Sequence, residues 1–432
     1  MYDIIKISNG LRVVLEEIDY VNSVSVGLWV KNGSRNENKD NSGISHFIEH
    51  MFFKGTEKRN AKEIAQSIED VGGQINAFTA KEATCYYVKI LDTHLDLALD
   101  VISDMIFNSK FDEEEIEKEK GVVIEEINMN EDSPEDVLIE LHSKAIWGDD
   151  PIALPILGNE NTVDSFTKEI LLDYISSRYI PENCVLSIAG KFNKNDILKL
   201  VEDYFGDWKF KGKNLINYSA PKILTNHLFK EKQIEQLHIS LGLTGIELGS
   251  DDLYPLLFLN NILGGGASSI LFQKIREELG RCYSIYSYLS ALNNTGVVSI
   301  YTGLNPKYST EVVALIKEEL EKFTKIDISN DRIIKGKEQL KGSYILGLES
   351  TSSRMFNNGK SVLFLDRINE PEVILKKIDT INKDRIYSVM DRTFKKGILN
   401  SAYVGEDVDL NLMKNIIENT IYPFNNKPST LI

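Results

Sequence analysis

The stretch GGQINAFTAKEATCYYVKIL (residues 72–91) reads as a strand, a turn and a second strand. A stretch of the same character returns at residues 282–304, CYSIYSYLSALNNTGVVSIYTGL. Runs rich in β-branched and aromatic residues on both sides of a polar turn predict a hairpin in each place. An apolar helical pattern and then a charged helical pattern follow both hairpins. The chain is therefore predicted to contain an internal repeat of one structural unit.

The other segments keep the same order in the two halves. The matched pairs are the strands at 23–30 and 238–243, the helices at 95–106 and 309–323, the charged helices at 112–130 and 329–348, and the strand–turn–helix segments at 181–205 and 399–417. The sequence therefore predicts an α+β fold of two tandem homologous α/β-sandwich domains, residues 1–215 and 216–432, each a mostly antiparallel sheet packed by helices. The joint is predicted within residues 211–233, which are polar and lack a sustained period.

The net charge and the hydropathy of the chain restrict the kinds of binding partner that are expected. The chain has 432 residues and a net charge of −16, with 65 acidic against 49 basic residues. Nucleic acid is disfavoured because phosphate binding needs a basic face. The charge fits either a solvated acidic exterior or a basic peptide substrate. No run approaches the ~18 apolar residues of a membrane helix, and three widely spaced cysteines indicate a reducing compartment. We therefore expect no membrane association and a cytoplasmic, bacterial protein.

The chemistry is concentrated in SHFIEHMFFKG, residues 45–55. On a helix, His46 and His50 are four residues apart and project from one face, so their imidazoles can share a tetrahedral zinc ion. Glu49 beside them can take a proton from a metal-bound water. A bare five-residue match also arises by chance on helix surfaces, but the apolar residues around these three favour a buried helix, where imidazoles need a partner.

A third ligand is expected on the charged helix at 112–130. Glu119 and Glu126 lie seven residues apart, two helical turns, and therefore share a face. One can bind the metal while the other orients a ligand histidine. A helix rich in Glu and Lys is otherwise a solvated surface. Contact with the core near Glu126 is nevertheless favoured by the apolar residues Val122, Val123, Ile124 and Ile127.

The run HFIEH, followed 76 positions after His50 by Glu126 in VVIEEINMNEDSPED, resembles the pitrilysin, mitochondrial-processing-peptidase-like family of inverted-zincin metallopeptidases, in its short two-domain branch. The resemblance covers nearly the whole chain. It implies that His46, His50 and Glu126 bind one Zn²⁺ per chain. It implies that Glu49 is the general base, and that Glu119 supports a ligand histidine from behind.

The resemblance also implies a substrate site. The implied residues are the edge strand Asn76, Ala77, Phe78 and Thr79 for a peptide that adds as a strand, Glu82 as further support of the metal site, and Arg276 and Tyr283 for substrate binding and the oxyanion. An ordinary hairpin with Phe78 in the core, a surface arginine and a packed tyrosine remain the alternatives for these stretches.

In the family, four such domains form a clamshell, of which this chain supplies half. The metal motif and the Arg/Tyr pair occur in one chain, so the resemblance implies a homodimer whose two active sites are each completed in trans. The function expected is a zinc metalloendopeptidase that cleaves unstructured peptides inside a closed dimeric chamber. A catalytically silent scaffold subunit and a peptide-binding module that does not cleave are the two alternatives.

Overall fold

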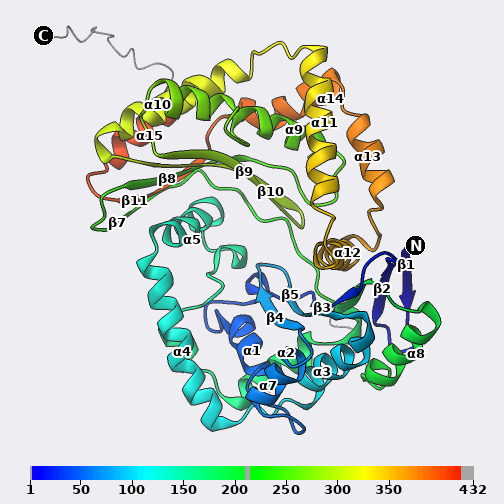
Figure 1. Ribbon diagram of the computed structural model, residues 1–432. Helices are drawn as coiled ribbons and strands as arrows, with labels where there is room; N and C mark the ends of the chain where they lie inside the picture. The colour runs from blue at the N-terminus through cyan, green and yellow to red at the C-terminus, as the bar shows by residue number, and fades with distance from the viewer. Residues whose placement is uncertain (1, 210–214, 420–432) are drawn as a thin grey trace, which may run out of the picture. The chain divides into compact units, whose positions relative to one another are not determined.

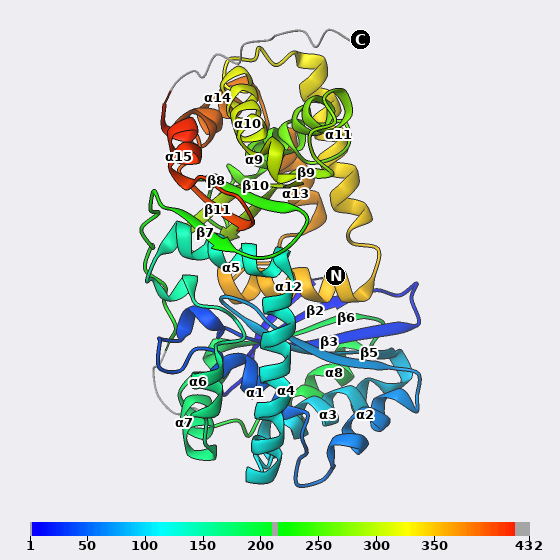
Figure 2. The same ribbon diagram turned by 90° about the vertical axis from the view of Figure 1, so that its left-hand side faces the viewer.

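The computed structural model describes residues 2–209 and 215–419 and contains two compact units (Figures 1 and 2). Each unit gathers separate stretches of the chain. The first unit consists of Met1–Asp132, Asp149–Pro221 and Glu338–Thr380, and the second consists of Ser133–Gly148, Lys222–Lys337 and Ile381–Ile432. Within the described residues, no helix is both long enough and apolar enough to cross a bilayer.

The first unit is built on a six-stranded sheet in the order β1-β2-β6-β3-β5-β4. Only the β2–β6 pair is parallel. The strands are β1 (Tyr2–Lys6), β2 (Arg12–Glu17), β3 (Ser23–Val30), β4 (Gln74–Thr79), β5 (Thr84–Leu91) and β6 (Cys184–Gly190). Because β4 ends the strand order, one of its backbone edges is left without a strand partner in this sheet.

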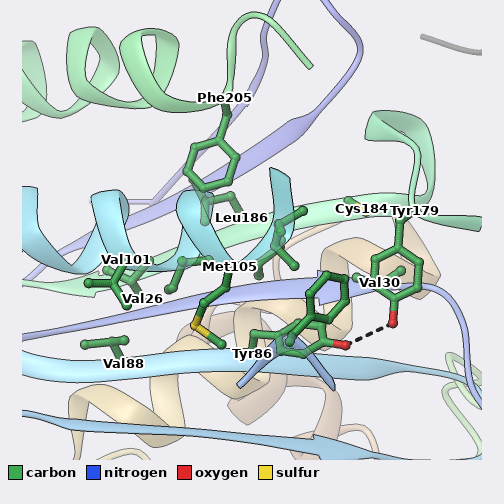
Figure 3. Close-up of a cluster of buried hydrophobic side chains, with 14 of the residues drawn as sticks. Val26, Val30, Tyr86, Val88, Val101, Met105, Tyr179, Cys184, Leu186 and Phe205 are labelled. Carbon is green, nitrogen blue, oxygen red and sulfur yellow. Dashed lines mark hydrogen bonds between the residues drawn. The ribbon is translucent and has the colours of Figure 1, made fainter. Parts of the chain in front are cut away.

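Alternation along the strands divides the core of the first unit between the two faces of its sheet. Val24, Val26 and Leu28 of β3 join the large cluster that includes the helices α1 and α3, whereas Trp29 joins a smaller cluster with α12. Figure 3 shows the first cluster, where the hydroxyls of Tyr86 and Tyr179 form a hydrogen bond of 3.0 Å. The helices of this unit are α1 (Ile44–Phe52), α2 (Ala61–Glu69), α3 (Leu95–Asn108), α4 (Glu113–Asp132), α6 (Glu160–Asp164), α7 (Lys168–Arg178), α8 (Lys194–Phe205), α12 (Thr351–Leu365) and α13 (Pro371–Asp379).

The second unit has a five-stranded sheet in the order β7-β11-β8-β10-β9, in which only β7 and β11 are parallel. The strands are β7 (His227–Glu231), β8 (Leu237–Thr244), β9 (Ser284–Leu292), β10 (Thr295–Leu304) and β11 (Asn400–Gly405). The helices are α5 (Pro134–Trp147), α9 (Leu253–Leu263), α10 (Ser309–Phe323), α14 (Lys383–Arg392) and α15 (Leu410–Glu418), while α11 (Asn330–Leu346) runs across the boundary between the units.

The two sheets share one topology. The order β2-β6-β3-β5-β4 corresponds strand for strand to β7-β11-β8-β10-β9, and the parallel pair takes the same place in both. The predicted tandem α+β architecture is therefore confirmed. The predicted joint at 211–233 was not read as containing a strand, yet β7 begins at His227. Residues 211–214 of that joint lie outside the described residues.

Each unit borrows one helix from the other half of the chain. Helix α5 comes from the first half but packs on β11, β8 and β7, and α12 comes from the second half but packs on β3, β6 and β2. Buried polar groups fix both helices. His142 of α5 lies between Ser240 and Asn400, at 2.8 and 3.1 Å, and Glu16 of β2 pairs with Arg354 of α12. The compact units are therefore discontinuous in sequence, and the predicted boundary between residues 215 and 216 stays a prediction.

The docking of α12 gives a matched pair of glycine substitutions. A Cβ atom on Gly359 would lie 2.2 Å from Nε1 of Trp29, whereas one on Gly342, an exposed position of α11, would meet nothing within 4 Å. We predict that Gly359→Ala lowers the free energy of unfolding by about 1–3 kcal/mol through overpacking. Gly342→Ala should raise it by up to about 1 kcal/mol, because alanine favours helix. Urea unfolding of both variants measures the difference, and equal effects would contradict the close packing of α12.

Candidate metal centre and catalytic site

The helix α1 carries the His-x-x-Glu-His motif and is anchored by its apolar residues. Phe47, Ile48 and Met51 are at most 1% exposed and belong to the core of the first unit. That packing turns the opposite side of the helix, with His46 and His50, away from the core. The two imidazole rings lie 4.5 Å apart between centroids, as expected for residues one helical turn apart.

Glu126 of α4 meets the two histidines. Its Oε2 atom lies 3.6 Å from Nε2 of His46 and 3.6 Å from Nε2 of His50. These three residues form a group whose ligand atoms all lie within 4.8 Å of one another. Around a tetrahedral zinc with bonds of about 2.0–2.1 Å, neighbouring ligand atoms are about 3.3 Å apart. The three residues therefore fit a zinc ion, and they would supply three of its four ligands.

A carboxylate and an ammonium group orient His50. Its Nδ1 lies 2.7 Å from Oε1 of Glu119, and the other oxygen of Glu119 lies 2.5 Å from Nζ of Lys54. Burial alone would raise the pKa of Glu119, but the hydrogen bonds from His50 and Lys54 lower it below its usual value. An ionised Glu119 accepts the Nδ1 proton and leaves the Nε2 lone pair of His50 facing Glu126, which is the tautomer that binds a metal.

His46 is held differently. Burial, followed by the proximity of His50, lowers the pKa of His46 to about 3, so the ring is neutral at ordinary pH and its nitrogen can act as a ligand. Its Nδ1 atom is buried, and within residues 2–209 and 215–419 no hydrogen-bond partner faces it. The orientation of His46 therefore depends on its packing and on the backbone of α1.

Glu49 lies between the metal cluster and the edge strand. The hydroxyl of Thr79 donates a hydrogen bond of 2.5 Å to Oε2 of Glu49. Burial raises the pKa of Glu49, and the hydrogen bond from Thr79 opposes part of that effect. A carboxylate whose pKa is raised binds a proton more readily, as a general base requires.

The edge strand β4 contains the four residues assigned to substrate. Thr79 contacts Glu49, as described. The backbone N–H of Ala77 donates to the side-chain oxygen of Asn76 at 2.8 Å. Phe78 packs edge-on against Trp29, with ring centroids 5.6 Å apart, so it contributes to the α12 face of the sheet. Phe78 is only partly buried, so both the substrate role and the alternative of a core residue in a hairpin stay predictions.

The remaining predicted residues lie outside the three-residue cluster. Glu82, in the turn after β4, is buried and forms an ion pair with Arg35. Arg276 and Tyr283 belong to the second unit. The guanidinium of Arg276 stacks on Phe272 at 4.6 Å from the ring centroid, and Tyr283 is 74% exposed.

Two contacts escaped the sequence reasoning. Lys54 lies four residues after His50 but beyond the end of α1 at Phe52, so helical spacing does not place it near Glu119. No sequence signal links Thr79 to Glu49, because a strand and a helix 30 residues apart supply them. Val122, taken with its neighbours as a sign that α4 enters the core, is 51% exposed, whereas Val123 is fully buried.

The fold and the group formed by His46, His50 and Glu126 are typical of a zinc-dependent peptidase, and comparison with known families agrees. Residues 12–160 match the family described as insulinase (peptidase family M16), and residues 165–340 match the M16 peptidase inactive domain. The chain belongs to peptidase family M16, and the predicted resemblance is confirmed.

Individual relatives are bacterial. The chain is 44% identical over 386 residues to the uncharacterized zinc protease YmxG of Bacillus subtilis, covering 89% of this chain and 94% of the relative. It is 36% identical to an uncharacterized zinc protease of Mycobacterium tuberculosis, covering 88% of each. A crystal structure of a protease from Helicobacter pylori superposes with a TM-score of 0.86 at 23% identity, covering 94% of this chain and 99% of that one, and shares the fold.

The Lys54–Glu119–His50 chain yields a testable expectation. We predict that Lys54→Met weakens zinc binding by about 10–100-fold, the range usual for residues that orient metal ligands. The cause is that Glu119 loses the cation that favours its ionised form. Lys54→Arg, which keeps the charge, should lose less affinity. Competition with a chromophoric chelator measures both variants, and wild-type affinity in Lys54→Met would refute the role of the ammonium group.

Proposed function

We propose that this protein is a zinc metalloendopeptidase that cleaves unstructured peptides inside a closed chamber formed by two copies of the chain in the bacterial cytoplasm. The observation that carries the proposal is the convergence of His46, His50 and Glu126, with Glu49 beside them and the open edge of β4 adjacent. The printed names of the relatives, zinc proteases, support the choice of metal and reaction.

The residues of α1 and α4 divide the chemistry. His46, His50 and Glu126 would hold one zinc ion, which as a Lewis acid polarises a carbonyl and lowers the pKa of a bound water to about 7. Glu49 accepts the proton of the attacking water and delivers it to the leaving amine. Thr79 holds the carboxylate of Glu49 in place, and Glu119 keeps His50 in the required tautomer.

The strand β4 accounts for a preference for extended peptides. A peptide that adds to its open edge would form main-chain hydrogen bonds irrespective of sequence. The Ala77 N–H, bonded to the Asn76 side chain at 2.8 Å, can transfer to a peptide carbonyl. A folded protein cannot present a free strand there, so the substrate must be unstructured. The net charge of −16 favours basic peptides over acidic ones.

The second unit supplies the remaining groups. Arg276 and Tyr283 would bind substrate and stabilise the oxyanion, acting from the second unit of the partner chain on the metal centre of the first. Glu82 would act indirectly, since its pairing with Arg35 holds the turn that follows Thr79.

Replacement of the base separates catalysis from binding. We predict that Glu49→Gln retains zinc, because Glu49 is not among the three residues of the metal cluster, and loses peptide cleavage by at least about 10²-fold. Metal content and hydrolysis of an unfolded reporter peptide are the measurements. Undiminished cleavage would remove Glu49 as the base. A wild-type protein that binds zinc and peptide but never cleaves would instead support the peptide-binding alternative, and one that binds neither would support a silent scaffold.

Completion of the site in trans is tested by mixing two inactive variants. One preparation carries Glu49→Gln, and the other carries Arg276→Ala with Tyr283→Phe. If each site joins the first unit of one chain to the second unit of another, random exchange of subunits restores about a quarter of the wild-type activity. The matched control mixes two Glu49→Gln preparations and should stay inactive. No recovery despite proven subunit exchange would place both halves of the site in one chain.

A further inference from the structure

The carboxylate of Glu37 contacts the first turn of α1 from a separate loop. One oxygen accepts the N–H of Gly43 at 2.7 Å, and the other accepts the N–H of Ser45 at 2.9 Å. We propose that Glu37 is the positioning residue of His46: its two hydrogen bonds fix the start of α1 and thereby the direction in which His46 reaches the metal. The inference rests on the metal site proposed above.

The start of α1 cannot cap itself. The N-cap is Gly43, whose φ is 91°. A Cβ atom there would lie 2.5 Å from the carbonyl oxygen of Leu157 and 2.8 Å from Cα of Gly158. The usual capping side chains of serine, asparagine or aspartate are therefore excluded at this position. Glu37, six residues earlier, supplies the acceptor oxygens instead, and its negative charge suits the positive end of the helix dipole.

Ser45, the residue directly before His46, is also held through its side chain. Its hydroxyl accepts a hydrogen bond of 3.0 Å from Asn32 and lies 3.2 Å from the hydroxyl of Tyr174. Tyr174 in turn donates to Asn32 at 3.0 Å, which closes the ring. Ser45 is thus fixed at its backbone by Glu37 and at its hydroxyl by two other elements of the first unit.

The two histidines differ in what orients them. His50 has Glu119 behind its Nδ1 atom, at 2.7 Å. The buried Nδ1 of His46 faces no partner in the described part of the chain. A ring without such a partner is oriented by its packing and by the direction of its Cα–Cβ bond, which follows the helix backbone. Glu37 therefore does for His46, through the backbone, what Glu119 does for His50 directly.

The burial of Glu37 imposes a desolvation cost on its carboxylate. The residue is 4% exposed, and burial raises the pKa of its carboxyl to about 6 although hydrogen bonds from Ser45 and Gly43 lower it. The group is therefore charged at neutral pH within the core. Desolvation of this carboxylate opposes the gain from its two hydrogen bonds and from the helix dipole, so we assign its benefit to the geometry that it imposes on α1.

The test compares two carboxylates of equal burial. Glu37→Gln keeps the shape of the side chain but turns an amide N–H₂ toward one of the two N–H donors, and Glu37→Ala removes both acceptors. The control is Glu16→Gln, because Glu16 is 3% exposed and bonded to Arg354 and Asn358, away from α1. The full-length protein is freed of metal, and its zinc affinity is measured by competition with a chromophoric chelator well below the unfolding temperature.

We expect zinc to bind about 10–100-fold more weakly to folded Glu37→Gln and Glu37→Ala. The absorption spectrum of bound Co²⁺ should change in both variants, because the coordination geometry is altered. Glu16→Gln should lower the unfolding temperature and leave zinc affinity and the Co²⁺ spectrum as in the wild type. If Glu37→Ala does not fold, the isosteric Glu37→Gln decides.

The outcomes separate this inference from the proposed function. Wild-type affinity and an unchanged Co²⁺ spectrum in folded Glu37→Gln overturn the role of Glu37 and leave the metallopeptidase proposal standing. A wild-type protein that takes up no zinc overturns both. An equal loss of affinity in Glu16→Gln would show a general effect of destabilisation and would also overturn the positioning role.

Discussion

The arrangement depends on one electrostatic constraint: two imidazoles and a carboxylate direct their ligand atoms at a common volume. The Oε2 atom of Glu126 lies 3.6 Å from the Nε2 atom of each histidine. This distance is too long for a hydrogen bond but short enough for a strong electrostatic interaction. A cation among them satisfies all three at once. Three features hold these ligand atoms in place: the length of α4, the packing of α1 on the core, and the ion pair of Glu119 with Lys54.

The sheet of the first unit positions the histidines of α1 and the edge strand β4 close to each other. Apolar residues of α1 pack on one face, which fixes the height of the histidines above the strands, and β4 ends the sheet next to Glu49. The hydrogen bond from Thr79 to Glu49 joins edge strand and helix directly. In the proposed mechanism this one hydroxyl would couple substrate alignment to proton transfer, because a movement of β4 would move Thr79, the hydrogen-bond partner of Glu49.

The sequence predicted what local pattern and internal repetition encode. Helical spacing located His46, Glu49 and His50, and the repeated order of segments predicted two sheets of equal topology, which β3 and β8 illustrate at 23–30 and 237–244. It did not predict that α5 and α12 exchange between the halves, because each packs on strands that are distant in the chain, as the bonds of His142 to Ser240 and of Arg354 to Glu16 show. Likewise the contact of Glu37 with α1 follows from loop geometry that no periodicity records.

The repeat explains why one copy of the motif is sufficient. At the position of α1, the second unit has α9, whose Leu256, Leu259 and Leu263 are at most 1% exposed and whose 11 residues include no histidine. A polar cluster there would leave buried groups without a cation, a cost that leucine side chains avoid while packing the same sheet. The two units thus share a scaffold that depends on apolar residues and not on the histidines. Among the described residues, the group suited to a metal ion lies in the first unit, where α1 presents both imidazoles to Glu126 of α4.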